Sequence, residues 1–211
     1  MEVRRMTVHE GLSKIKTADS RIEKLLETKF IDCAKKNADK INGKSISDYK
    51  KVLQGSLDKI TDVIKETNSI KAAISRSNAS TTINVGGIEM TVAEAIYLWK
   101  HGIPMQKYLL QELQNQYSEC LLIIEKKNGK DLDDRADKFV SSIFGTKEKA
   151  DPKDVDDLTK KFKEQNSWEL VDPNKLWDRI QKMEEEISTF ESSVDSAIQM
   201  SNATTMIEFT V

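Results

Sequence analysis

Few side chains in this sequence have the types and spacings that catalysis or metal binding requires. His9 and His101 are the only histidines, and neither has a second His, Cys or acidic residue at the short helical spacing of a metal site. The acidic runs 131–134 and 154–157 lack the central Gly and the twelfth-position Glu of a calcium loop, which favours solvated helix starts. The pair at 86–87 lacks the further Gly and the Lys of a phosphate loop, which favours a turn. We therefore expect no enzymatic activity, no catalytic residue, no metal and no cofactor.

The cysteine, lysine and apolar patterns exclude further classes. Cys33 and Cys120 are far apart and have no second ligand at metal spacing, so neither a disulfide framework nor a zinc site is expected. Lysine pairs are dispersed without interleaved aromatic residues, which argues against nucleic-acid binding. The longest apolar run, Cys120 to Ile124, has five residues, so we expect no signal peptide and no membrane span. The expected location is the cytoplasm of a bacterial host cell, or a virion.

The most specific feature is an internal repeat with an offset of 124 residues. The segment 73–83, AISRSNASTTI, recurs at 197–207 as AIQMSNATTMI, with seven of eleven positions identical. Each copy stands where a long apolar helix gives way to a strand-like stretch, so we expect two similar helix exits that lie near each other. One interpretation is structural, with the Asn of each copy at or near the helix C-cap and Ser and Thr hydroxyls binding the freed carbonyls. The other is a polar ligand pocket formed by the polar residues of both exits, namely Ser77, Asn78, Thr81, Ser201, Asn202 and Thr205.

At these residues the chain resembles the septicolysin-like proteins, a family of small helical bacterial proteins largely without assigned function. The resemblance covers 74–81, Gly87, Met90-Thr91 and the closing segment 195–205, with Ala203 where the family pattern has Trp. It implies a helical fold and, through the family label alone, a membrane-active toxin. The opening segment 6–12 and the richness in Lys, Asn and Ile look like helical proteins of phages and prophages. Neither resemblance supplies a catalytic residue.

Composition and periodicity predict a mainly α protein. The 211 residues are 38% hydrophobic and 32% charged, with only 8 Gly and 3 Pro, which is too apolar for disorder and too poor in turn residues for a many-stranded β fold. Apolar stripes of helical period predict four long helices, at 8–37, 46–77, 92–128 with a kink at Gly102 and Pro104, and from Asp172 to the second Ser-Asn-Ala.

Period-2 stretches predict one small antiparallel sheet at one end of an elongated bundle of three to four long antiparallel helices. It would contain a hairpin at 82–90 and a C-terminal strand at 205–211. We expect a single domain over 1–211, with an irregular or short-helix insertion at about 128–172.

Charge is unevenly distributed along the chain. Residues 1–80 hold 17 Lys and Arg against 11 Asp and Glu, a balance of +6, and residues 81–211 hold 16 against 24, a balance of −8, which together give the net charge of −2. The opposite signs can be satisfied within one molecule or by contact between molecules. The sequence therefore favours a structural or assembly protein, phage- or prophage-encoded, that acts through self-association or protein–protein contacts. The alternatives are an anti-defence protein that sequesters a small ligand, such as a nucleotide signal, at the Ser-Asn-Ala corners, and the membrane-active toxin.

Overall fold

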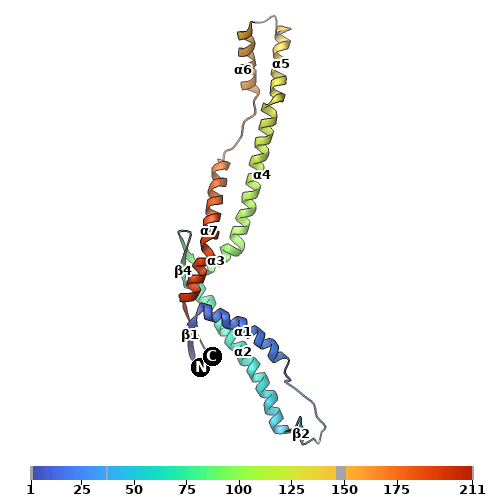
Figure 1. The fold of residues 1–211 in the computed structure, drawn as a ribbon, viewed down its shortest axis with the longest axis vertical. Coiled ribbons are helices and arrows are strands. Elements are labelled where there is room, and N and C mark those ends of the chain that lie inside the picture. The colour runs from blue at the N-terminus through green and yellow to red at the C-terminus, as the bar shows by residue number, and fades with distance from the viewer. Residues whose placement is uncertain (1, 37, 146–150, 211) are drawn as a thin grey trace. The chain divides into compact units, whose positions relative to one another are not determined.

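The structure, a computed structural model, describes residues 2–36, 38–145 and 151–210 and is mainly α (Figure 1). The prediction of the fold class is confirmed. The helices in chain order are α1 (Val8–Leu26), α2 (Ile46–Ser80), α3 (Val92–Tyr97), the π-helical turn η1 (Leu98–Gly102), α4 (Ile103–Asn128), α5 (Lys130–Phe144), α6 (Pro152–Asn166) and α7 (Leu176–Thr204).

The described strands form three separate antiparallel pairs. They are β1 (Val3–Thr7) with β6 (Met206–Thr210), β2 (Lys40–Ile41) with β3 (Lys44–Ser45), and β4 (Thr82–Val85) with β5 (Ile88–Thr91). The predicted hairpin at 82–90 and the predicted C-terminal strand both exist. The expectation that they share one sheet is wrong, because β6 pairs with β1, a strand that the sequence analysis did not predict. Because β6 pairs with β1, Ile207 and Phe209 of β6 pack with Met6 of β1 in one hydrophobic core.

Contacts divide the chain into two compact units, which we describe separately. Unit 1 comprises Met1–His101 with Thr189–Val211, and unit 2 comprises Gly102–Ser188. The segment expected to be an irregular or short-helix insertion lies inside unit 2, and its described residues include the two short helices α5 and α6. Phe139 of α5 stacks on Phe162 of α6 at 4.7 Å between ring centroids. The single domain over 1–211 stays a prediction.

The core of unit 1 forms where α1 and α2 meet the strand pair β1–β6. Val8, Ile70 and Ile74 are buried there together with the inward-facing residues of β1 and β6. Gly11 lets the helices approach closely, because a Cβ atom at this position would lie 3.2 Å from the side chains of Ile70, Ile74 and Ile207. The apolar stripe of α2 thus has both a helix and a sheet to pack against.

Helix α1 is shorter than predicted. It ends at Leu26 rather than near residue 37, and the backbone N–H and hydroxyl of Thr28 both donate to the carbonyl of Leu25. The described residues between α1 and the short hairpin β2–β3 are not helical, and the hairpin's turn residues Asn42 and Gly43 have positive φ. Apolar periodicity alone missed this end because it continues weakly beyond the last helical turn.

The interruption predicted at Gly102 and Pro104 is present as a change of helix type. Residues 98–102 form a π-helical turn between α3 and α4. Pro104, which stands in the first turn of α4, has no N–H and its ring would clash with the carbonyl four residues earlier. A wider π turn ahead of the proline relieves this clash and keeps the chain helical.

Candidate functional site

The two Ser-Asn-Ala corners have nearly the same backbone geometry. The Thr81 N–H donates to the Ser77 carbonyl at 2.8 Å, and the Thr205 N–H donates to the Ser201 carbonyl at the same distance. The hydroxyls of each Ser and Thr pair lie 3.4 Å apart in both copies. The sequence repeat is therefore a structural repeat.

Hydroxyl groups bind carbonyls in the last turns of both helices, but not the freed carbonyls that the structural interpretation expected. Ser80 Oγ donates to the carbonyls of Arg76 and Ser77, and Thr204 Oγ1 donates to those of Met200 and Ser201. The Ser77 and Ser201 carbonyls also accept from the N–H groups of Thr81 and Thr205, so each of these hydroxyls adds a second donor to a carbonyl that is already bonded.

The expected role of Asn as C-cap is wrong. Asn78 lies inside α2, and the C-cap of that helix is Thr81 in an extended conformation, with φ −80° and ψ 122°. Asn202 likewise lies inside α7. Among the described residues, the non-glycine residues with positive φ are Asn42 and Lys175, so neither corner uses a left-handed cap. Each helix instead ends because its chain turns directly into a strand.

The similarity of the corners extends through the strands that follow. The Val92 N–H donates to the Thr81 carbonyl and the Val8 N–H to the Thr205 carbonyl, each at 3.0 Å. In the β4–β5 pair Ile83 lies opposite Met90, and in the β6–β1 pair Ile207 lies opposite Met6.

A second repeat, which the sequence analysis missed, accompanies the first. Residues 6–10 read Met-Thr-Val-His-Glu and residues 90–94 read Met-Thr-Val-Ala-Glu, at an offset of 84. Each Thr is an N-cap with a complete capping box, to Glu10 in α1 and to Glu94 in α3. The backbone N–H of each Thr is the main cause of the lowered pKa of the Glu in its box. Comparison of all short motifs with one another would have found this signal.

Together the two repeats make unit 1 a duplicated framework. In each copy a long helix ends at a Ser-Asn-Ala corner and continues into a strand, and that strand pairs with one that begins another helix. The glycine turn at 86–87 joins the strands in one copy. In the other copy the paired strands lie at the two ends of the chain, which Figure 1 shows close together.

A shallow pocket of about 320 Å³ lies between the corners. Three of the six predicted site residues line it, namely Thr81, Ser201 and Thr205. The other three, Ser77, Asn78 and Asn202, are not among its lining residues. The walls also contain Asn84 of β4 and the apolar Met200 of α7, so the pocket offers mixed hydroxyl, amide and apolar contacts.

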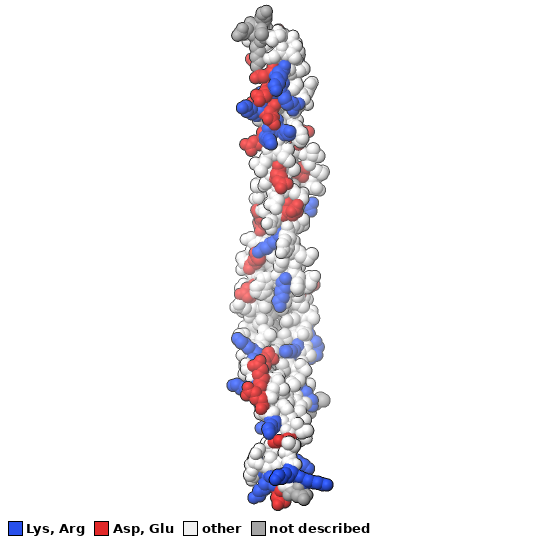
Figure 2. Space-filling view, turned by 90° about the vertical axis from the view of Figure 1, so that its right-hand side faces the viewer, with Lys and Arg blue, Asp and Glu red and all other residues white. Residues whose placement is uncertain are grey.

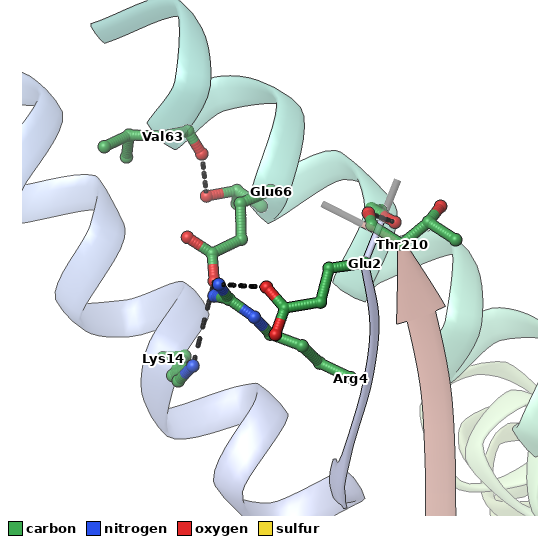
Figure 3. Close-up of polar contacts among 8 residues, drawn as sticks. Glu2, Arg4, Lys14, Val63, Glu66 and Thr210 are labelled. Carbon is green, nitrogen blue, oxygen red and sulfur yellow. Dashed lines mark hydrogen bonds and ion pairs between the residues drawn. The ribbon is translucent and has the colours of Figure 1, made fainter. Parts of the chain in front are cut away.

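A second pocket, of about 240 Å³, lies between α1 and α2 and was not predicted. Its lining residues are Ser13, Lys14, Thr17, Ala18, Arg21, Val63, Glu66, Thr67 and Ile70. At its edge Glu66 Oε1 lies 3.7 Å from Arg4 Nη1 and 3.8 Å from Lys14 Nζ, and Arg4 Nη2 also pairs with Glu2 at 2.9 Å (Figure 3). The pocket is thus rich in hydrogen-bond donors and positive charge.

In unit 2, α4 packs against the first part of α7 through one side only. Gln114 donates to Glu184, and the Tyr117 ring stacks on Trp177 at 5.5 Å between centroids. Only Ile103 of this 26-residue helix is buried. Large apolar side chains elsewhere on α4 are exposed, namely Met105, Tyr108, Leu109, Leu121, Leu122 and Ile123.

The three tryptophans are all partly exposed and do not anchor a core. Trp99, Trp168 and Trp177 are 41%, 49% and 53% exposed. Trp168 is held by its backbone, because its N–H donates to Asn128 Oδ1 and its carbonyl accepts from Asn128 Nδ2, each at 2.7 Å. Lys127 Nζ lies 5.6 Å from its ring centroid.

Within the described ranges, no group of three or more His, Cys, Asp or Glu side chains could hold a metal ion. No described helix is long and apolar enough to cross a membrane. Both cysteines are free and exposed. Comparison of the chain with models of protein families, with curated proteins and with solved structures gave no match. The resemblance to septicolysin-like proteins stays a prediction.

Proposed function

We propose that this chain is a non-enzymatic assembly protein that associates with a second copy of itself along the exposed face of α4. The observation that carries the proposal is a line of exposed residues on the side of α4 opposite the one that faces α7. Successive residues of this line are alternately four and three positions apart. They are Met105, Leu109, Glu112, Gln116, Glu119 and Ile123, and we call this line the α4 seam. Such spacing is that of a two-stranded coiled coil.

The order of residues in the α4 seam favours an antiparallel pair. Apolar residues stand at both ends, flanked by the exposed Tyr108 and Leu122, and polar residues stand in the middle. In a parallel pair Glu112 would face its own copy, and like charges at facing positions repel. In an antiparallel pair Glu112 faces Gln116, Met105 faces Ile123, and Leu109 faces Glu119, so no two carboxylates of the seam face each other.

Association by this face does not depend on the charge imbalance along the chain. Lys, Arg, Asp and Glu side chains are interspersed on the face shown in Figure 2. Some of the imbalance is also satisfied within the molecule, because Arg5 of β1 pairs with Glu208 of β6. We therefore expect an oligomer that persists at high salt, whereas association through oppositely charged segments would weaken.

Light scattering coupled to size-exclusion chromatography tests the proposal. The unaltered chain should elute as a dimer. Leu109→Glu should give a monomer because it places a carboxylate opposite Glu119, and Ile123→Glu should do so because it replaces the apolar contact with Met105 by a buried charge. Gln106→Glu is the matched control, since it adds the same charge outside the seam and should leave the dimer intact. A monomer of the unaltered chain at every concentration, or a dimer that survives both seam variants, would refute the proposal.

A second candidate function rests on the pocket between the corners. Because Thr81, Ser201 and Thr205 bring hydroxyls from both repeats to one cavity, it suits a small polar ligand, as in the sequestering interpretation. A nucleotide or metabolite that binds there should raise the melting temperature of the unaltered chain but not of Thr81→Val/Thr205→Val. The absence of a thermal shift across a nucleotide and metabolite panel would contradict this function.

A further inference from the structure

The pocket between α1 and α2 breaks the duplication of unit 1. The two halves superpose in helix phase, because the buried Ile70 and Ile74 of α2 correspond, 124 residues later, to the buried Val194 and Ile198 of α7. At the same offset Glu66 corresponds to Phe190, which is 8% exposed. Where one half buries an aromatic ring, the other half has a carboxylate beside a cavity.

The second helix of each half has the same phase relative to its strand pair. Val8 and Val92 are equivalent and both buried, which fixes the phase of α1 relative to α3 at the offset of 84. At this offset Ser13, which lines the pocket, corresponds to Tyr97. Tyr97 is 62% exposed, whereas the buried Phe190 shows that an aromatic ring at the place of Glu66 is compatible with this framework, so a carboxylate there is not a requirement of the fold.

The free groups of the pocket are donors. Within the described part of the chain, neither the Arg21 guanidinium nor the Ser13 hydroxyl has a hydrogen-bond or ion-pair partner. Lys14 is 3.8 Å from Glu66, which is longer than a direct hydrogen bond, so its ammonium can turn to a ligand. The Glu66 carboxylate also lines the pocket, and it forms ion pairs of similar length with Lys14 and with Arg4, at 3.7 Å to the latter, so Arg4 remains its partner when Lys14 turns to a ligand (Figure 3).

We propose that the pocket between α1 and α2 binds a small oxyanion, the phosphate or carboxylate group of a small molecule. Arg21 and Lys14 supply the charge, Ser13 donates a hydrogen bond, and Val63, Ala18 and Ile70 contact the apolar part of the ligand. Guanidinium and ammonium groups bind phosphates and carboxylates through charge-assisted hydrogen bonds. A volume of about 240 Å³ limits the ligand to a small one.

Amide NMR titration at constant ionic strength tests this site. The probes are inorganic phosphate, acetate, glycerol 3-phosphate and, as the neutral control, glycerol. We expect saturable shifts confined to residues 13–21 and 63–70 for at least one oxyanion and none for glycerol. A response to phosphates alone or to acetate alone assigns the oxyanion, and a response to both shows that the site accepts either.

Three variants separate the site from general charge effects. Arg21→Ala should weaken binding at least tenfold, and Ala18→Leu should abolish it by filling the cavity while every charge stays in place. Lys16→Ala, which removes a cation of α1 that does not line the pocket, should bind as the unaltered chain does. Shifts that do not saturate, or that are the same in Arg21→Ala and Lys16→Ala, would overturn the proposal, as would the absence of any response.

Discussion

Asp32 ties the segment after α1 to the start of α2 through both of its carboxylate oxygens. Oδ2 accepts from Lys29 Nζ at 2.9 Å and from the Tyr49 hydroxyl at 2.8 Å, and Oδ1 accepts from the Cys33 N–H. The bond from Lys29, followed by that from Tyr49, lowers the pKa of Asp32 from 3.8 to about 2. The bond to Asp32 also raises the pKa of Tyr49.

These shifts predict how stability depends on pH. Because the folded-state pKa of Asp32 is below its unfolded value, its contribution is complete above about pH 4 and is lost as pH falls from 3.8 toward 2. The raised pKa of Tyr49 acts in the opposite direction, so its contribution is lost as pH rises above 10. Asp32→Asn should flatten the dependence of the melting temperature on pH in both ranges. If the melting temperature of this variant fell between pH 4 and pH 2 as much as that of the unaltered chain, the contribution assigned to Asp32 would be contradicted.

Asn78 and Asn202 lead to a second prediction at the residue scale. Neither side chain has a hydrogen-bond partner within the described ranges, and both residues lie in helices, where Ala is favoured over Asn. The double variant Asn78→Ala/Asn202→Ala should therefore change the free energy of unfolding by no more than about 0.5 kcal/mol, in the stabilising direction. Urea unfolding measures this. A loss of about 1 kcal/mol per site, the usual cost of a lost cap, would restore the capping role.

The sequence identified the corners but not which of their side chains face the pocket. The repeat and its hydroxyl residues can be read directly from the amino-acid sequence. Whether Ser77 or Ser201 lines a cavity depends on which side of each helix the other corner packs against. That packing arises from strand pairing between distant residues, so the sequence predicted all six residues and the pocket has three of them.

At the scale of elements, local signals were reliable and distant pairings were not. The capping boxes at Thr7 and Thr91 and the N-cap at Ser45 can be read from the sequence, because each involves residues within one turn. Strand β1 was missed because, of its apolar residues, Val3 is 61% exposed and only Met6 is buried. Its extended conformation follows from pairing with β6, about two hundred residues away.

The two capping boxes predict matched stability effects. Thr7→Ala and Thr91→Ala should each cost about 1 kcal/mol of unfolding free energy, because each removes the acceptor for a first-turn N–H. Each should also raise the pKa of the Glu in its box, since the Thr hydroxyl is one cause of the lowered value. Urea unfolding and NMR titration of the Glu carboxyl carbons measure these effects. Thr17→Ala, whose hydroxyl bonds within a helix, is the control, and an equal cost there would contradict a capping effect.

At the scale of the whole molecule, the β4–β5 and β1–β6 pairs are equivalent parts of the duplicated framework, so either pair could be the one whose strands a short turn joins. The turn at 86–87 joins β4 to β5, and both glycines have positive φ, as a two-residue hairpin turn requires. In the equivalent pair Val3 lies opposite Thr210, so a short link there would form the same kind of hairpin.

This equivalence predicts that a circular permutant folds. A chain that begins at Gly87, ends at Gly86 and joins residue 211 to residue 1 through a short Gly-rich link keeps every strand pair and every helix. We expect the same far-UV circular dichroism spectrum and cooperative unfolding, with stability lowered mainly by the entropy of the opened β4–β5 turn. A permutant opened inside α2, at Gly55, is the control and should be far less stable, because the break interrupts the helix that contributes Ile70 and Ile74 to the core. If both permutants lost structure equally, the hairpin connection would be essential and the two strand pairs would not be equivalent.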